Sequence, residues 1–232
     1  MPCNIGYKSV ARAQIPAPQP QTFKAKADAP KIDADLLAKL GSEDEEFLGW
    51  LIELNIKPLL EEALKRALSR LAIKGIELSI NDKGELEARG RYVSDKEKQN
   101  LSEIFYRVSE RWQFEVLGIV AELLGYEVKI TQNGDEFILE AEEEGKSHPC
   151  DYIKITKKGG DATIVFEHFK SRKDLEVETA KFLALAHKLG IKIVIGDSTV
   201  SEGDPFPSEN RHTHDHHYHH GHSHEHGHDH KH

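Results

Sequence analysis

Apolar side chains recur at steps of three and four over residues 94–125, which predicts one long amphipathic helix. Ser94 and Glu97 have the S-x-x-E spacing of a capping box, and Gly125 suits the left-handed residue that ends a helix. At about 1.5 Å per residue this helix would be roughly 45 Å long, so other elements must pack along it or it must kink, with Gly118 as the candidate. Its core-facing stripe would consist of Leu101, Ile104, Phe105, Val108, Trp112, Val116, Ile119, Val120, Leu123 and Leu124.

Strict alternation of apolar and polar residues predicts three antiparallel hairpins around this helix. The first covers residues 76–88. The second covers 126–141 and turns on Asn133 and Gly134, a pair that favours a two-residue type I′ loop. That loop would set Ile130 opposite Phe137, Val128 opposite Leu139 and Tyr126 opposite Ala141.

The third hairpin covers residues 150–168 and turns on the Gly-Gly pair at 159–160. This loop would set Ile153 opposite Phe166 and Ile155 opposite Ile164, so that apolar side chains meet. After it, Ser171 is the predicted N-cap of a helix that ends at Gly190, and residues 191–195 form the last predicted strand.

Three shorter helices are predicted over residues 31–75. Ser42 is the expected N-cap of the second helix, and Pro58 suits the first turn of the third. The third helix has a leucine-rich face and a charged face, on which Glu62 precedes Arg66 by four residues. The charged face is most simply a solvated one, and the leucine face is core or a dimerisation surface.

Residues 1–30 hold five of the nine prolines and few large apolar side chains. Such a segment cannot bury enough apolar surface to offset the entropy of ordering it. We therefore expect a disordered, Pro-rich arm, which is either a plain leader or a docking segment for a partner.

These elements predict an α+β fold in which three short antiparallel β-hairpins pack on a long central helix. The expected organisation is a disordered Pro-rich arm at residues 1–30, a helical unit at 31–75, an α+β body at 76–196 and a disordered His-rich tail at 197–232.

Composition narrows the classes of function. The net charge is −9, so the chain lacks the basic surface that nucleic-acid binding needs, and we predict no nucleic-acid partner. No apolar run approaches a membrane span and no signal-peptide core is visible, so we predict a cytoplasmic protein without a membrane partner. The two cysteines, Cys3 and Cys150, provide neither a disulfide framework nor zinc-finger spacing.

Reactive side chains of the body gather around the third hairpin, at His148, Cys150, Asp151, Glu167, His168 and Lys170. This layout resembles that of metal-dependent nucleases, but Glu167 and Lys170 are separated by two residues rather than one. The predicted register also sets Asp151 beside His168 and turns Glu167 to the opposite face. An Asp–His cross-strand pair without catalytic activity is the simpler interpretation.

The tail carries the strongest chemical signal, because twelve of the fifteen histidines fall within residues 212–232. Neutral imidazole is a common ligand of divalent first-row metals, and H-x-H spacing lets a flexible chain place several rings around one ion. We therefore predict a site for Ni²⁺, Zn²⁺ or Cu²⁺. Its ligands would be His212, His214, His216, His217, His219, His220, His222, His224, His226, His228, His230 and His232.

This tail resembles the histidine-rich tails of nickel- and zinc-handling accessory proteins, such as hydrogenase and urease maturation factors and a nickel-binding prolyl isomerase. The resemblance covers about a tenth of the chain and implies storage or delivery of metal. Residues 101–140 resemble an uncharacterised cyanobacterial and plastid family with the order helix, glycine, hairpin, which implies no activity.

The leading hypothesis is a metal-binding accessory or storage protein. The alternative is a scaffold or subunit of a complex that engages a protein partner, or a second copy of itself, through the Pro-rich arm or the helical unit, with an incidental tail. A weaker alternative is an enzyme with a site near Asp151 and His168.

Overall fold

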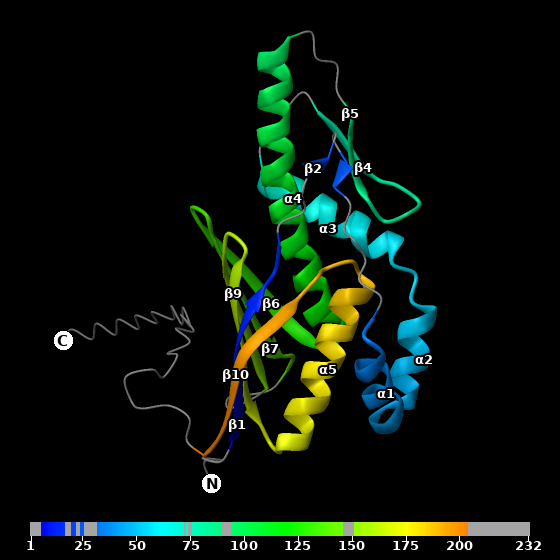
Figure 1. Cartoon of the computed structure of the whole chain (residues 1–232), viewed down its shortest axis with the longest axis vertical. Coiled ribbons are helices and arrows are strands. Elements are labelled where there is room, and N and C mark those ends of the chain that lie inside the picture. The colour runs from blue at the N-terminus through cyan, green and yellow to red at the C-terminus, as the bar shows by residue number, and fades with distance from the viewer. Residues whose placement is uncertain are drawn as a thin grey trace, which may run out of the picture.

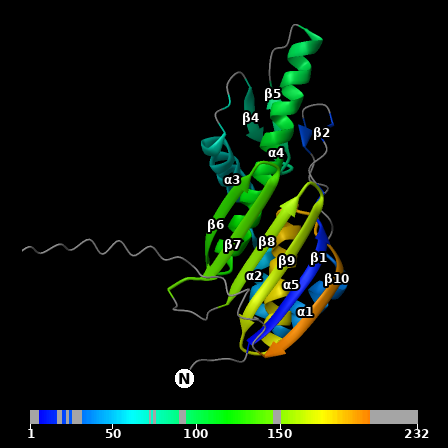
Figure 2. The ribbon, with the colours of Figure 1, turned by 90° about the vertical axis from the view of Figure 1, so that its left-hand side faces the viewer.

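The computed structural model describes residues 6–16, 20–21, 24–25, 32–71, 73, 76–89, 94–145 and 151–203. These residues form an α+β fold, in which helices cover one face of an antiparallel sheet (Figure 1). Figure 2 looks onto the other face of this sheet, with the helices behind it. No helix in the described part of the chain is long and apolar enough to cross a membrane.

The main sheet has six strands in the order β10-β1-β9-β8-β7-β6. Each strand pairs antiparallel with its neighbours. The strands are β1 (Gly6–Gln14), β6 (Tyr126–Asn133), β7 (Glu136–Glu143), β8 (Tyr152–Lys158), β9 (Asp161–Phe169) and β10 (Val194–Gly203). The second and third predicted hairpins are therefore neighbours in one sheet.

Strand β1 corrects the expected disordered arm, because it lies inside the sheet between β9 and β10. Ala11, Ala13 and Ile15 alternate toward the core and are 7%, 4% and 0% exposed. Alanine is a poor strand former, and both partner strands lie far along the chain, so local composition concealed this strand. The rest of the predicted arm is described only at Pro16, β2 (Pro20–Gln21) and β3 (Lys24–Ala25).

Strand β10 corrects the other end of the body, because the tail was expected to begin at residue 197. The strand pairs with β1 from Gly6 opposite Gly203 to Gln14 opposite Val194. β10 is an edge strand, and its apolar residues Val194 and Val200 are 46% exposed. An edge strand does not need one fully apolar face, and the sequence of β10 shows no clear apolar alternation. Pairing with β1, rather than its own composition, makes this segment a strand.

The loop between β6 and β7 also differs from the prediction. The loop residues are Gly134 and Asp135, so Ile130 pairs with Leu139 and Val128 with Ala141. Gly134 has φ 63°, while Asp135 is not among the positive-φ residues, which suits a type II′ rather than a type I′ turn. The register error is two residues, and therefore the same side chains still face the core.

The loop between β8 and β9 confirms the prediction. Ile153 pairs with Phe166 and Ile155 with Ile164, as the Gly-Gly loop required. Phe166 then packs edge-on against Phe182 of helix α5 (Arg172–Lys188), with ring centroids 5.8 Å apart. The N-cap of α5 is Ser171, as predicted, and its hydroxyl accepts from the amide of Asp174 at 3.0 Å.

The long helix is α4 (Asp95–Leu123), with the predicted capping box of Ser94 and Glu97 and with Gly125 at φ 89°. The presence of glycine at position 118 is explained by packing rather than by a kink in the helix. A Cβ at this position would lie 3.0 Å from the side chain of Ile130 and 3.5 Å from that of Val128. Glycine therefore lets β6 approach α4 closely.

Helices α1 (Ala34–Glu43), α2 (Glu45–Glu53) and α3 (Lys57–Arg70) occupy the region predicted as helical. Proline stands in the first turn of α3, as predicted. The cap of α2 is Asp44 instead of Ser42: its carboxylate accepts from Phe47 N at 2.9 Å, while the Ser42 hydroxyl donates to the carbonyl of Lys39. An aspartate competes well with serine as an N-cap, and the sequence offered both.

One hydrophobic core joins the helical region to the sheet. Trp112 of α4 is fully buried, and its indole N–H donates to the carbonyl of Leu60 in α3 at 3.1 Å. The predicted boundary at residues 75/76 therefore does not divide the core. Strands β4 (Glu77–Ile80) and β5 (Leu86–Arg89) pair as the first predicted hairpin and join β2 and β3 in a second, four-stranded sheet.

Candidate functional site

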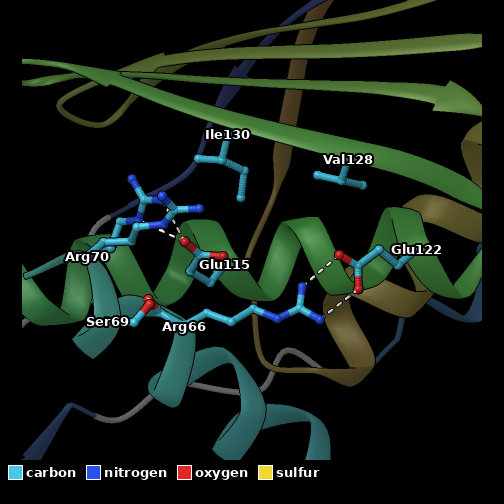
Figure 3. Close-up of a pocket in the computed structure, with 8 residues that line it drawn as sticks. Arg66, Ser69, Arg70, Glu115, Glu122, Val128 and Ile130 are labelled. Atoms are coloured by element: carbon cyan, nitrogen blue, oxygen red, sulfur yellow. Dashed lines mark hydrogen bonds and ion pairs between the residues drawn. The ribbon is translucent and has the colours of Figure 1, made fainter.

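A pocket of about 290 Å³ lies where α3, α4 and β6 meet (Figure 3). Figure 3 shows the α3 residues on one side, the two glutamates on α4, and the β6 residues above them. Its walls carry three arginines, two glutamates, one serine and two aliphatic side chains. The lining residues are Arg66, Ser69, Arg70, Arg111, Glu115, Glu122, Val128 and Ile130.

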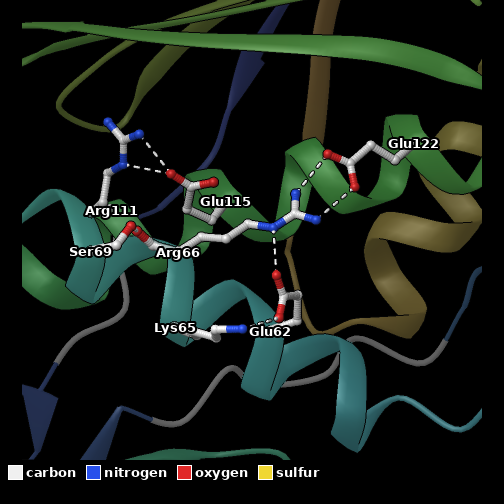
Figure 4. A network of polar contacts seen from close by, with 7 residues as sticks. All are labelled: Glu62, Lys65, Arg66, Ser69, Arg111, Glu115 and Glu122. Carbon is white, nitrogen blue, oxygen red and sulfur yellow. Dashed lines mark hydrogen bonds and ion pairs between the residues drawn. The ribbon is translucent and has the colours of Figure 1, made fainter.

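Arg66 is fully engaged in holding α3 against α4 (Figure 4). Its two terminal nitrogens donate to the two oxygens of Glu122 at 2.6 and 3.0 Å, and its Nε donates to Glu62 at 3.1 Å. The hydrogen bond to Glu122 is the main reason that the pKa of Arg66 is raised. This bidentate pair is a structural clamp.

Arg111 and Glu115 form a second ion pair one helical turn apart on α4. Their side chains are only 6% and 7% exposed, and both Nε and Nη2 of Arg111 donate to the same oxygen of Glu115, at 2.9 and 2.6 Å. The third nitrogen, Nη1, has a long 3.5 Å contact with Gln132. No described residue donates a hydrogen bond to the other oxygen of Glu115, Oε2.

Arg70 is the last residue of α3 and is exposed at the pocket wall. Its guanidinium has no hydrogen bond or ion pair with any described residue. The hydroxyl of Ser69 donates to the carbonyl of Arg66 at 2.7 Å. Arg70 is therefore the one arginine of this pocket whose charge is not compensated by a carboxylate of the described chain.

The pocket has the chemistry of a binding site for an anion. Its two glutamates pair with Arg66 and Arg111, and its single hydroxyl, that of Ser69, is already used as a donor. The residues that line it therefore include no nucleophile with a neighbouring general base. The sequence did not identify this site. The four-residue spacing of Arg66 and Arg70 was a weak signal, but the partners on α4 and β6 are brought near only by folding.

Glu167 and His168 are arranged differently from the prediction. Glu167 is buried, and its carboxylate lies 2.8 Å from Lys8 Nζ of β1 and 3.9 Å from Nε2 of His168. His168 has φ 70°, and the pairing of β1 with β9 shifts here, so a bulge brings Glu167 and His168 together instead of placing them on opposite faces. Lys8 was missed because its strand was missed.

The other predicted ligands of this region, His148 and Cys150, lie outside the described residues, as does Cys3. Lys170 follows β9 and is exposed. Within the described chain, no group of three or more His, Cys, Asp or Glu side chains is arranged to hold a metal ion.

All twelve histidines of the predicted metal site, between His212 and His232, also lie outside the described residues. Comparisons with protein-family models, with curated proteins and with solved structures found no match to this chain.

Proposed function

We propose that this is a cytoplasmic accessory or storage protein that binds divalent transition metal through its histidine-rich tail. The observation that carries the proposal is the density of ligands: twelve imidazoles in 21 residues, interspersed with acidic and small residues. Only three of the fifteen histidines lie outside the tail, and solubility alone does not require this concentration of histidine.

The tail chemistry favours some metals over others. Imidazole nitrogen suits Ni²⁺, Cu²⁺ and Zn²⁺, whose affinities follow the Irving–Williams order when no rigid cavity selects among them. The segment from 212 to 232 contains neither cysteine nor methionine, so it lacks the soft sulfur ligands that favour Cu(I). We therefore expect several divalent ions per chain.

The test is titration calorimetry of Ni²⁺ into the full chain and into a truncation that ends at Asn210. This truncation keeps β10, which ends at Gly203, so the sheet stays complete. A matched variant with all twelve tail histidines replaced by glutamine keeps the length and the neutral polarity. We expect high-stoichiometry binding by the full chain alone. If both altered chains retain its stoichiometry and affinity, the metal site lies in the body and the proposal is wrong.

A scaffold role is the second candidate, and exposed apolar side chains on α2 favour it. Trp50 is 39% exposed and Ile52 is 64% exposed, both within the helical region that was expected to dock a partner or a second copy. Strand β1 is excluded from such docking because it is in the sheet. Light scattering during size-exclusion chromatography tests self-association: loss of a dimer in Ile52→Lys would support it, and a monomer at all concentrations would remove this form of the candidate.

A further inference from the structure

Among the described residues, the pocket between α3, α4 and β6 combines an arginine without a carboxylate partner, a carboxylate oxygen that accepts no hydrogen bond, and an apolar wall. We propose that it binds a small organic hydroxycarboxylate. The carboxylate is held by Arg70 and by Nη1 of Arg111, the hydroxyl donates to Oε2 of Glu115, and the hydrocarbon part lies against β6. None of the residues that line this pocket belongs to the histidine-rich tail.

The charge argument begins with which arginines are already neutralised. Arg66 directs all three of its nitrogens at Glu122 and Glu62, and Arg111 directs two of its nitrogens at Glu115. Arg70 has no described carboxylate partner. One uncompensated positive charge matches one carboxylate, and the planar guanidinium fork suits its geometry.

The buried pair on α4 supplies the second recognition element. Glu115 is held in place because Arg111 donates twice to Oε1, so Oε2 has a defined position. The oxygens of a carboxylate that is paired with a guanidinium act as hydrogen-bond acceptors. A ligand carboxylate placed there would be repelled, whereas a hydroxyl satisfies the oxygen. The pair therefore selects a ligand that carries a donor beside its acid group.

The apolar wall and the volume set the size of the ligand. Val128 and Ile130 are half-buried and point from β6 into the pocket, close to the backbone of Gly118. A volume of about 290 Å³ accommodates a ring or a short branched chain with its acid group, and is too small for a dinucleotide. A compact hydroxy acid fills all three parts of the pocket.

The test uses mandelate as the probe, with nuclear magnetic resonance titration of the full chain. Two matched compounds separate the contributions of the hydroxyl and of the carboxylate charge to binding. Phenylacetate lacks the hydroxyl, and mandelamide lacks the charge. Arg70→Gln removes the proposed anchor on α3, and Arg107→Gln removes an exposed arginine of α4 that does not line the pocket. Because Arg70 is exposed and unpaired with described residues, Arg70→Gln should keep the melting temperature of the parent.

We expect mandelate to shift the amide signals of α3, α4 and β6 around the pocket. Arg70→Gln should weaken binding by about tenfold or more, Arg107→Gln should leave it unchanged, and mandelamide should not bind. Phenylacetate should bind several-fold more weakly than mandelate. The proposal is overturned if millimolar mandelate shifts none of these signals, if Arg70→Gln binds as well as the parent, or if inorganic phosphate binds the pocket more tightly than mandelate.

Discussion

Replacing Ile15 by alanine tests whether the first segment of the chain is a mobile leader or part of the core. Ile15 directly follows β1 and is 0% exposed, and its amide donates to the carbonyl of Gly160 at 2.9 Å. The next residue, Pro16, accepts a hydrogen bond from the side chain of Gln113 in α4 at 2.8 Å. These contacts tie the first segment of the chain to both the sheet and the long helix.

The expected cost follows from this burial. Ile15→Ala removes three carbons, worth roughly 2.4 kcal/mol of apolar transfer at about 0.8 kcal/mol each, and the remaining cavity adds to that. We expect about 3–4 kcal/mol of destabilisation in total. For a domain of this size, about 3 °C per kcal/mol predicts a melting temperature lower by roughly 10 °C.

Circular dichroism melting of the variant, with urea unfolding as a second probe, measures this effect. Arg12→Ala is the matched control because Arg12 is exposed on the same strand, and we expect a change within about 0.5 kcal/mol. A melting temperature for Ile15→Ala within a degree or two of the parent would refute the placement of β1 in the core.

Three further predictions concern the body and the tail. Burial raises the pKa of the Glu178 carboxyl, so the free energy of unfolding should fall as pH rises through the titration of this group. Glu178→Gln should therefore be more stable than the parent at pH 7 and equally stable below the ordinary carboxyl pKa. Thermal melts of both proteins across pH measure this difference. Trp112→Phe should cost about 2 kcal/mol in urea unfolding, because it removes the indole bond to Leu60 and leaves a small void; an unchanged midpoint would contradict this packing. Protons compete with metal for imidazole, whose ordinary pKa is about 6.5, so the tail should lose Ni²⁺ as pH falls through about 6. Calorimetric affinities that stay flat from pH 8 to pH 5 would argue against histidine ligands.

The elements that the sequence predicted well carry their signals within one segment. The capping box of Ser94 and Glu97 and the terminal Gly125 define α4 without help from the rest of the chain. The Gly-Gly loop fixes the register of β8 and β9 in the same way. The loop at Gly134 was one position from the prediction, because either residue beside that glycine could complete a two-residue turn.

The features that the sequence did not predict depend on distant partners. The buried positions of strand β1 are two small residues, Ala11 and Ala13, and its partners lie on β9 and β10, so the pairing has no clear local signature. The pocket was not predicted for the same reason: its residues come from distant segments of the chain. Arg66 looked like part of a solvated helix face, yet its bidentate partner Glu122 lies 56 residues away on α4. Neither the pairing of β1 nor the Arg66–Glu122 ion pair can be inferred from composition.

The metal content of the protein isolated from cells tests the central claim most directly. The full chain and its matched variant with twelve tail glutamines should be expressed in medium supplemented with Ni²⁺ and Zn²⁺. Both should then be purified without chelators or metal-affinity resin and analysed by plasma mass spectrometry. We predict more than one divalent ion per full chain and almost none in the glutamine variant. Equal metal content in the two proteins, or a metal-free full chain, would contradict the account.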